Sequence, residues 1–386
     1  MVTRRSCYKY NKCLNVRIFY MTPINVACQK EYKEIYELLL KQKGLQIVDY
    51  MFYNCKKLKE FAIPLNIKSI GNYAFQLCTS LNTIIIPSSV TSIGHYAFLS
   101  CNNLKSIKLP SSIISIGIGA FQKCTKLSQI DLPSSVTKIE QHAFSGCFRL
   151  SNKSIISFTL IKEIEPFTFE DCVSLVELII PNSVEKIGSS LFCRCKSLKQ
   201  IFIPSSVTVI EMNTFYECFS LEKVELNAKI TQIENGVFSK CTSLHSITIP
   251  STVTLIGEKS FYGCSSLTEV LIPPSVVTIG IASFESCSSL KKVIISSSVK
   301  KIEQHAFSQC TSLTDVTIPN SVISIGQYAF SKCESLTNIE IPSSVTEIGK
   351  NVFKGCSSIK EILVPSNLIS HGNQAFAGCT KLVKKV

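Results

Sequence analysis

The feature that most constrains this chain is a cysteine that returns every 23 residues. The series runs from Cys55 to Cys147, makes one step of 25 residues to Cys172, and continues by 23 to Cys379. It contains 15 of the 19 cysteines, and a phenylalanine precedes each of them by three residues, as Phe52 precedes Cys55. A fixed period of this length indicates stacked structural repeats. We therefore expect one elongated solenoid, and not the two or three globular domains that 386 residues would otherwise suggest.

The repeat reads C-x-x-L-x-x-I-x-I-P-x-S-V-x-x-I-G-x-x-A-F-x-x. Its first half alternates apolar and polar residues, which predicts a half-buried strand that ends at the proline, because proline cannot donate to a strand ladder. Its second half returns apolar residues every three or four positions, which predicts irregular or 3₁₀ segments on the convex side. Glutamates such as Glu140 and Glu303 replace the glycine in several repeats. We therefore expect glycine to be favoured at this position because space is limited, and not because the backbone is left-handed.

Each repeat would form one turn of the solenoid, which we call a rung. Rungs placed side by side would pair their strands and merge their apolar residues into one long core. The fold class that follows is a leucine-rich-repeat-like solenoid with a curved parallel β-sheet, of about 14 rungs over residues 45–386. Residues 1–44 form a basic leader that ends in an amphipathic capping helix over residues 29–44. Its apolar face, Tyr32, Ile35, Tyr36 and Leu39, would cover the first rung.

The net charge of +13 is unevenly spread along the chain. Residues 1–60 carry 12 Lys/Arg and 5 Asp/Glu, so +7 falls in the first sixth, and the remaining charges are interleaved in sign. Interleaved charge predicts a solvated surface, so no nucleic-acid partner is expected. No run of 18 apolar residues predicts a transmembrane segment. Arg17 and Pro23 interrupt the apolar core that a signal peptide would need.

The cysteine ladder predicts buried free thiols. Ladder side chains point in parallel, so disulfides between rungs would require distortion, and zinc sites usually need paired C-x-x-C motifs, which the sequence lacks. The sequence leaves open the state of Cys7, Cys13, Cys28 and Cys193. The histidines fall at different repeat positions, and no phosphate-binding glycine loop or G-x-S-x-G motif is found. We therefore expect no enzyme, no metal and no cofactor.

The residues that vary between repeats lie at the outward strand positions. Because strand side chains alternate, the fifth and seventh residues after each ladder cysteine should face outward on the concave side. At the seventh position two pairs of adjacent rungs carry large apolar residues, Ile179 with Phe202 and Leu271 with Ile294. Isolated exposed aliphatic residues are normal, and sheet propensity alone can place isoleucine there. The adjacent pairs are nevertheless the candidate partner-binding residues.

The repeat L-x-x-I-x-I-P-S-S-V-T-x-I-G-x-x-A-F-x-x-C, as in residues 267–287, resembles the BspA-like class of leucine-rich repeats over residues 45–386. The resemblance implies a non-catalytic surface antigen or adhesion protein whose concave face binds a protein or matrix macromolecule. The alternative is an intracellular scaffold or regulatory protein that uses the same face. Free thiols and the lack of a clear secretion signal or anchor favour that alternative. Cell surface and cytoplasm therefore both remain as expectations.

Overall fold

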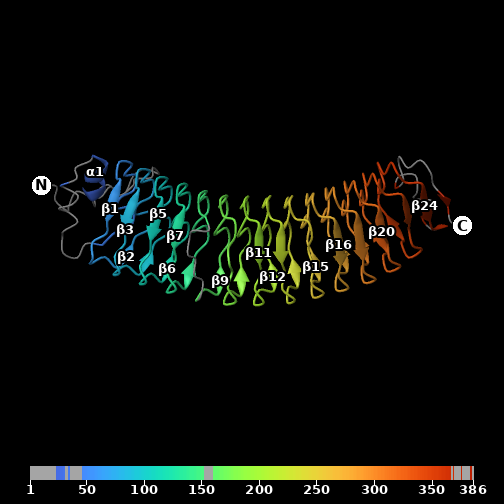
Figure 1. Ribbon diagram of the computed structural model, residues 1–386, viewed down its shortest axis with the longest axis horizontal. Helices are drawn as coiled ribbons and strands as arrows, with labels where there is room; N and C mark the ends of the chain where they lie inside the picture. Colours follow the sequence, from blue (N-terminus) through green and yellow to red (C-terminus); the bar gives the residue numbers. More distant parts are fainter. Residues whose placement is uncertain are drawn as a thin grey trace, which may run out of the picture.

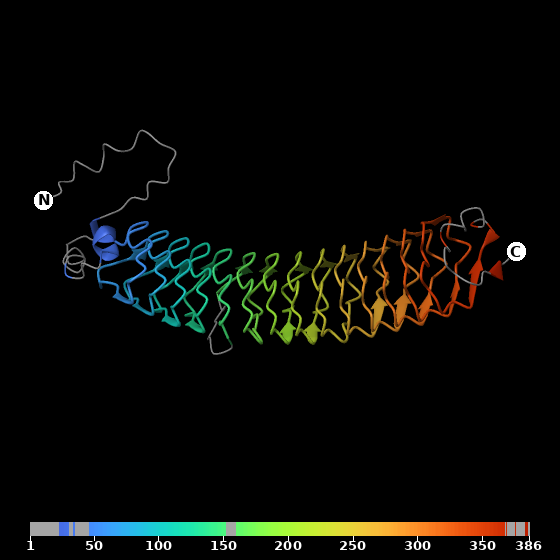
Figure 2. The same cartoon turned by 90° about the horizontal axis from the view of Figure 1, so that it is seen from above.

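The described residues form a long, gently curved rod, with α1 (Pro23–Gln29) at one end and β24 (Glu361–Val364) at the other (Figures 1 and 2). The computed structural model describes residues 23–30, 34, 46–151, 160–366, 368, 375 and 383–384. The chain winds as a parallel β-solenoid of about 13 turns. The predicted fold class is thus confirmed.

Each full turn of the solenoid has a long-strand side and a short-strand side. The long strands, at the L-x-x-I-x-I step, are β1 (Glu60–Ala62), β3 (Thr83–Ile85), β5 (Ser106–Lys108), β7 (Gln129–Asp131), β11 (Gln200–Phe202), β13 (Lys223–Glu225), β16 (Glu269–Ile272), β18 (Lys292–Ile295), β20 (Asp315–Thr317), β22 (Asn338–Glu340) and β24 (Glu361–Val364). The short strands, at the V-x-x-I step, are β2 (Ser69–Ile70), β4 (Ser92–Ile93), β6 (Ser115–Ile116), β8 (Lys138–Ile139), β9 (Glu163–Ile164), β10 (Lys186–Ile187), β12 (Val209–Ile210), β14 (Gln232–Ile233), β15 (Leu255–Ile256), β17 (Thr278–Ile279), β19 (Lys301–Ile302), β21 (Ser324–Ile325) and β23 (Glu347–Ile348). The final strand, β25 (Val383–Lys384), pairs with β24.

Strand pairing is parallel throughout the described residues, and it is more continuous on the short-strand side. That side forms a four-stranded sheet β2-β4-β6-β8, the pair β9-β10 and a seven-stranded sheet from β12 to β23. The long strands divide into β1-β3, β5-β7, β11-β13, β16-β18-β20 and β22-β24-β25. Strand ladders are therefore interrupted on both sides of the solenoid, at more points on the long-strand side than on the short-strand side.

Two columns of side chains fill the core. The ladder phenylalanines from Phe52 to Phe353 are fully buried, and successive rings stack, as Phe98 and Phe121 do with centroids 5.3 Å apart. Each ladder cysteine from Cys78 to Cys356 donates its S–H to the carbonyl oxygen of a phenylalanine in a preceding rung, with Sγ–O distances of 3.0–3.4 Å. The cysteines are therefore hydrogen-bond donors between rungs as well as small buried groups.

Serine forms a second column of donors beside the prolines. The hydroxyl of Ser135 donates to the carbonyl oxygen of Ile113 at 2.7 Å, and Ser321 donates to Val299 at the same distance. Both bonds join a residue to the turn before it, 22 positions back in sequence. In several repeats the serine before the valine thus satisfies a main-chain carbonyl of the preceding rung.

The outer segments between the short strand and the next cysteine are successive turns and not 3₁₀ helices. Two residues in each of these segments have a left-handed backbone, such as Tyr73 with φ 57° and Leu77 with φ 61°. Alternate N–H groups reach the next rung, since Tyr73 donates to the carbonyl oxygen of His95 at 2.8 Å and Phe75 donates to that of Ala97 at 2.7 Å. Repeated hydrogen bonds between rungs offset the strain of left-handed non-glycine residues.

The glycine of the repeat is not one of these left-handed positions. Gly94 and Gly188 lack a positive φ, which confirms the interpretation from the glutamate substitutions. A β-carbon at Gly94 would lie 2.8 Å from the backbone nitrogen of Asn72 in the preceding rung. Glycine there permits close approach of neighbouring backbones.

A short helix, α1 (Pro23–Gln29), packs at the N-terminal end of the solenoid. Ile24 and Cys28 are buried with the core, and Asn25 donates from its side-chain amide to the carbonyl oxygen of Tyr53 at 2.8 Å. The sequence pattern did not predict this helix. The helix predicted over residues 29–44 lies outside the described residues apart from Gln29, Lys30 and Glu34. The boundary at residue 44 stays a prediction.

Candidate partner-binding face

The outward side chains at the fifth and seventh positions after each ladder cysteine form what we call the long-strand face. All four predicted residues lie there and point into solvent. Ile179 is 82% exposed, Phe202 54%, Leu271 55% and Ile294 47%. The alternation that exposes them buries the residues between, as in the exposed–buried pattern of β16. Their exposure is confirmed, while their role in binding and the concave placement of this face stay predictions.

Leu271 and Ile294 form the better-defined apolar pair. They are direct partners in the ladder of β16 and β18, and the next partner in the row is Thr317 in β20. A row of charges runs beside them at the fifth position, where Lys292 lies 3.7 Å from Asp315. An exposed apolar pair beside alternating charges is typical of a protein-binding surface.

Ile179 and Phe202 are joined more loosely. A single β-bridge, Glu177 to Gln200, sets their rungs in register two residues earlier, and the side-chain amide of Gln200 donates to the carboxylate of Glu177 at 3.3 Å. Phe202 then pairs with Glu225 in β13. These two exposed residues therefore lie on adjacent rungs without being partners in a strand ladder.

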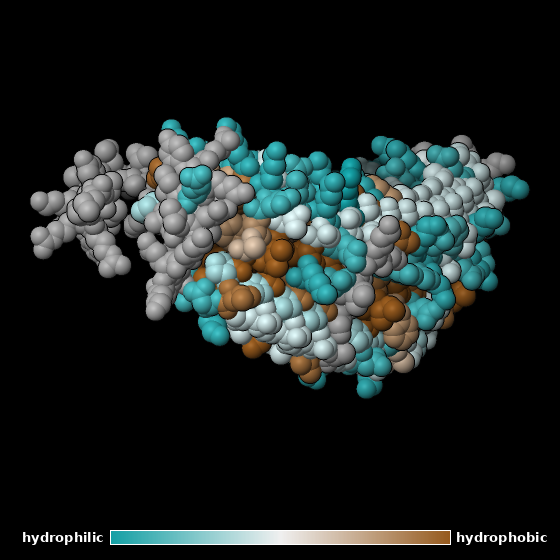
Figure 3. All heavy atoms as spheres, turned by 60° about the vertical axis from the view of Figure 1, so that its left-hand side comes forward, coloured by the Kyte–Doolittle hydropathy of each residue, from teal (hydrophilic) through white to brown (hydrophobic). Residues whose placement is uncertain are grey.

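Apolar side chains reach the surface elsewhere too, and Figure 3 shows them as brown patches among hydrophilic ones on the face that it presents. Ile85 is one example on the long-strand face, but its row neighbours Ala62 and Lys108 offer no large apolar partner. Single exposed residues of this kind are ordinary.

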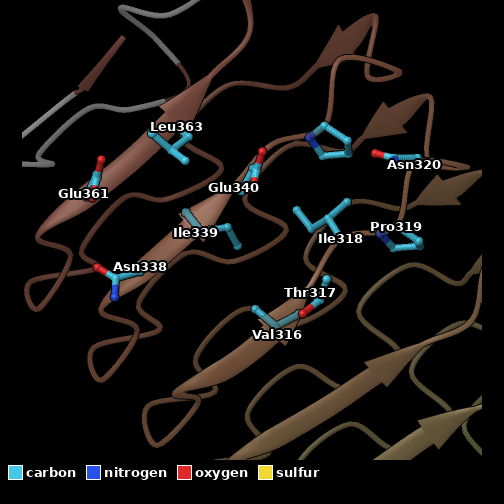
Figure 4. Close-up of a pocket in the computed structure, with 11 residues that line it drawn as sticks. Val316, Thr317, Ile318, Pro319, Asn320, Asn338, Ile339, Glu340, Glu361 and Leu363 are labelled. Carbon is cyan, nitrogen blue, oxygen red and sulfur yellow. The ribbon is translucent and has the colours of Figure 1, made fainter. Parts of the chain in front are cut away.

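A groove opens on the same side of the solenoid, where the neighbouring strands β20 and β22 share no ladder (Figure 4). It has a volume of about 540 Å³ and begins at Thr317, in line with Leu271 and Ile294. Its lining comes from three rungs and comprises Val316, Thr317, Ile318, Pro319, Asn320, Asn338, Ile339, Glu340, Pro342, Glu361 and Leu363. Sequence reasoning missed the groove, because these residues follow the repeat like any others.

The turns that precede the ladder cysteines carry a network of ion pairs between neighbouring rungs. Arg194 donates from Nε and Nη2 to the two carboxylate oxygens of Asp171, each at 2.7 Å, and also from Nη2 to Glu170 at 2.7 Å. Burial raises the pKa of the neighbouring Cys193 to about 11, so its thiol is protonated at neutral pH. The ion pairs of Arg194 with Glu170 and Asp171 thus join the turns of two neighbouring rungs.

The 16 cysteines in the described part of the chain are free and buried, as predicted for the ladder. These include Cys28 and Cys193, whereas Cys7, Cys13 and Cys379 lie outside the described residues. Within the described ranges, no group of three or more His, Cys, Asp or Glu side chains is placed to hold a metal ion. None of the helices in those ranges is long and apolar enough to cross a membrane.

The parallel rungs, the buried phenylalanine column and the regular 23-residue turn define a leucine-rich-repeat solenoid. The family described as BspA type leucine rich repeat region (6 copies) matches residues 45–163, 162–291 and 277–385. The chain therefore belongs to this family, which confirms the resemblance found in the sequence. Comparison with curated proteins gives no significant match.

Solved structures include similar leucine-rich repeat proteins from bacteria. A leucine-rich repeat protein from Bacteroides ovatus is 32% identical, with 89% of this chain and 88% of that chain covered and a TM-score of 0.71. A leucine rich cell surface protein from Faecalibacterium prausnitzii is 26% identical, with 84% and 86% covered and a TM-score of 0.47. A leucine-rich repeat protein from Eubacterium ventriosum is 23% identical, with 77% and 89% covered and a TM-score of 0.46.

Proposed function

We propose that this chain is a non-catalytic protein-interaction solenoid of the surface antigen or adhesion type, which binds a protein or matrix macromolecule through its long-strand face. The observation that carries the proposal is the pairing of Leu271 with Ile294, two exposed apolar side chains held side by side by a strand ladder. A rigid sheet lowers the entropic cost of binding, because its side chains are already in place.

The placement of the protein at the cell surface rests on its family. An intracellular scaffold remains the second candidate, and the free thiol column favours it, because the S–H groups that bridge rungs must stay reduced. Labelling of intact cells with a membrane-impermeant amine reagent separates the two. Labelled exposed lysines support the surface protein, and lysines labelled only after lysis support the scaffold.

Replacing exposed apolar anchors by glutamate tests the binding face. A partner is first recovered by pull-down with the wild-type protein and purified. The double variants Ile179→Glu/Phe202→Glu and Leu271→Glu/Ile294→Glu are then titrated with it. We expect at least one to weaken binding by about 30-fold or more, as for interface anchors that contribute roughly 2 kcal/mol each. Melting temperatures should stay close to wild type, because these side chains lie outside the core.

The matched control is Ala62→Glu/Thr248→Glu, which adds the same two charges at exposed positions of the same row. It should bind as the wild type does. If both apolar variants bind normally, the long-strand face is not the binding surface. If the control weakens binding as much as they do, added negative charge, and not loss of apolar contact, is responsible.

A further inference from the structure

We propose that the first five rungs bind a linear sulfated polysaccharide along a basic edge that adjoins the long-strand face. We define the basic edge as the first, second and fourth residues after each ladder cysteine, at the corner where a rung turns toward its long strand. The inference goes beyond the proposed function, because it assigns a second ligand to different positions of the rod.

The basic edge collects positive charge that the rest of the rod lacks. From Cys55 to Cys356 its positions hold 10 Lys/Arg and 2 Glu, and in the first five rungs they hold six basic residues and no acidic one. The six are exposed and comprise Lys56, Lys57, Lys59, Lys105, Lys126 and Arg149. The outward strand positions beside them in the first four rungs add Lys108 and only two carboxylates, Glu60 and Asp131. A field of one sign therefore lies along this end of the rod.

Most of these charges have no partner of opposite sign in the protein. Elsewhere on the rod lysines pair with carboxylates, as Lys240 does with Glu217 at 2.7 Å. Among the residues that the structure describes, Lys59, Lys105 and Arg149 form no ion pair with any carboxylate. Their charged groups are therefore available to the anionic groups of a ligand, and no internal ion pair has to be broken when one binds.

Main-chain hydrogen bonds hold the basic edge in register from rung to rung. The N–H of Asn82 donates to the carbonyl oxygen of Lys59 at 2.7 Å, and the N–H of Ser128 donates to that of Lys105 at 2.9 Å. Neighbouring phenylalanine rings stack 5.3 Å apart, so cations recur along the edge at intervals of about 5–10 Å, which is one or two rungs. Such a line of cations matches a polymer whose anionic groups repeat along its length, and not a small anion, which needs ligands that converge.

The neutral residues of the basic edge suit a sugar polymer. In the first five rungs they are Thr79, Ser80, Asn82, Asn102, Asn103, Thr125, Ser128, Phe148 and Ser151. All but Phe148 carry a hydroxyl or an amide, groups that can exchange hydrogen bonds with sugar hydroxyls. Lys126 donates from Nζ to Oδ1 of Asn103 at 2.6 Å, and this leaves the amide N–H groups of Asn103 as donors. Phe148 is 45% exposed next to Arg149, where its ring offers apolar contact to a sugar ring.

The same composition argues against a nucleic acid. Single-stranded nucleic acids are held on rows of aromatic side chains on which the bases stack, and Phe148 is the one aromatic residue at these positions of the first five rungs. Five of the six basic residues are lysines. Lysine acts as a point charge, whereas arginine is favoured where phosphates are bound in a bidentate way. Sulfate groups along a polysaccharide are therefore the better match.

A heparin oligosaccharide tests the proposal directly. A fluorescently labelled heparin decasaccharide is titrated with the full-length protein, and its anisotropy is measured. We expect saturable binding that weakens as salt is raised, because exposed charges are screened. A hyaluronate decasaccharide, which carries carboxylates but no sulfates, should bind more weakly, and an uncharged dextran of similar length should not bind.

A triple variant places the site. Lys59→Gln/Lys105→Gln/Lys126→Gln removes three exposed charges of the basic edge and should weaken heparin binding by about tenfold or more, because three modest charge pairs are lost together. The dependence of its affinity on salt should also be shallower than that of the wild type, since fewer counterions are released. An unchanged melting temperature shows that the variant is folded.

The matched control is Lys68→Gln/Lys300→Gln/Lys301→Gln, which removes the same charge from exposed positions on the short-strand side. It should bind heparin nearly as the wild type does. Equal weakening by this control overturns the proposal, because attraction would then be a property of total charge. Normal binding by the basic-edge variant overturns it as well.

Two further outcomes separate the ligand class and the proposed function. If a single-stranded DNA of equal charge displaces heparin as effectively as unlabelled heparin does, the assignment to a sulfated polysaccharide is wrong. The proposed function fails separately. If heparin does not bind saturably but Leu271→Glu/Ile294→Glu still loses the purified partner, only the basic-edge inference is wrong.

Discussion

At the scale of single residues, two roles explain why a cysteine recurs at the ladder position. It fills a small buried space, and its S–H donates to a carbonyl oxygen that also accepts a backbone N–H in its own rung. The carbonyl oxygen of Phe75, for example, accepts from the N–H of Cys78 and from the thiol of Cys101, each at 3.1 Å. An alanine could occupy the space but could not donate a hydrogen bond. A valine could not donate one either, and it would fit the space poorly.

The buried thiols make stability sensitive to alkali. Burial raises the pKa of Cys124 to about 12, and that of Cys287 to about 12 as well. In the unfolded chain a thiol ionises near pH 8.5. A raised folded pKa gives stability that is present below the unfolded value and lost as pH rises toward the folded one. Between about pH 9 and 12 the free energy of unfolding should fall by about 1.4 kcal/mol per pH unit for each such thiol.

Urea titrations at pH 8 and pH 10 in a reducing buffer measure this fall. Cys124→Ala should be less stable at pH 8, yet its stability should decline less with pH, by about one thiol's share. Equal declines in the variant and the wild type would mean that Cys124 ionises as readily in the folded protein as in the unfolded one. The buried-column description of that residue would then be wrong.

At the scale of one element, each rung contacts only its neighbours, so damage to a rung and removal of a rung should differ. Phe261 is fully buried and stacks on Phe238 at 5.3 Å and Phe284 at 5.0 Å. Phe261→Ala leaves a cavity between two rings and should cost about 3–5 kcal/mol. Deleting residues 265–287, one 23-residue unit, should cost less, because the register survives. Chemical denaturation of both variants compares them, and unfolding by the deletion alone would contradict a solenoid.

The sequence predicted the rung well and the fit between rungs poorly. Alternation was enough to place Ile179 and Leu271 outward, because a strand pattern has period two and one buried face. The left-handed backbone at Tyr73 escaped prediction, since no glycine marks it and bonds to the next rung sustain it. The groove at Ile318 escaped as well. Its residues obey the repeat, so the sequence pattern does not show that β20 and β22 share no ladder.

At the scale of the whole molecule, the net charge differs between the first and the second part of the rod. Residues 46–151 carry 10 Lys/Arg and 4 Asp/Glu, a net +6, whereas residues 160–366 carry 17 and 20, a net −3. The groove and the Leu271–Ile294 pair both lie in the second, more acidic part. Long-range attraction of a basic partner would therefore favour the part of the rod that holds the proposed binding residues.

The continuity of the short-strand sheets predicts where the rod opens first. β14, β15, β17, β19 and β21 each pair on both sides within the seven-stranded sheet, whereas β9 and β10 pair only with each other. This short pair lies next to the 25-residue step, the one departure from the 23-residue period. Since a solenoid's stability is roughly a sum of nearest-neighbour terms, local opening should be least costly where a rung lacks one of its ladders.

Amide hydrogen exchange followed by mass spectrometry should therefore show the slowest exchange in peptides that contain β15 and β17. Peptides that contain β9 and β10 should exchange faster by about tenfold or more, because an opening that costs 1.4 kcal/mol less is about ten times more populated. The stacking of Phe144 on Phe169 at 5.6 Å still links the two sides of the step, so this exchange should be a local opening below global unfolding. Equal protection along the rod would show instead that the phenylalanine column alone couples the rungs, and that the strand ladders add little to cooperativity.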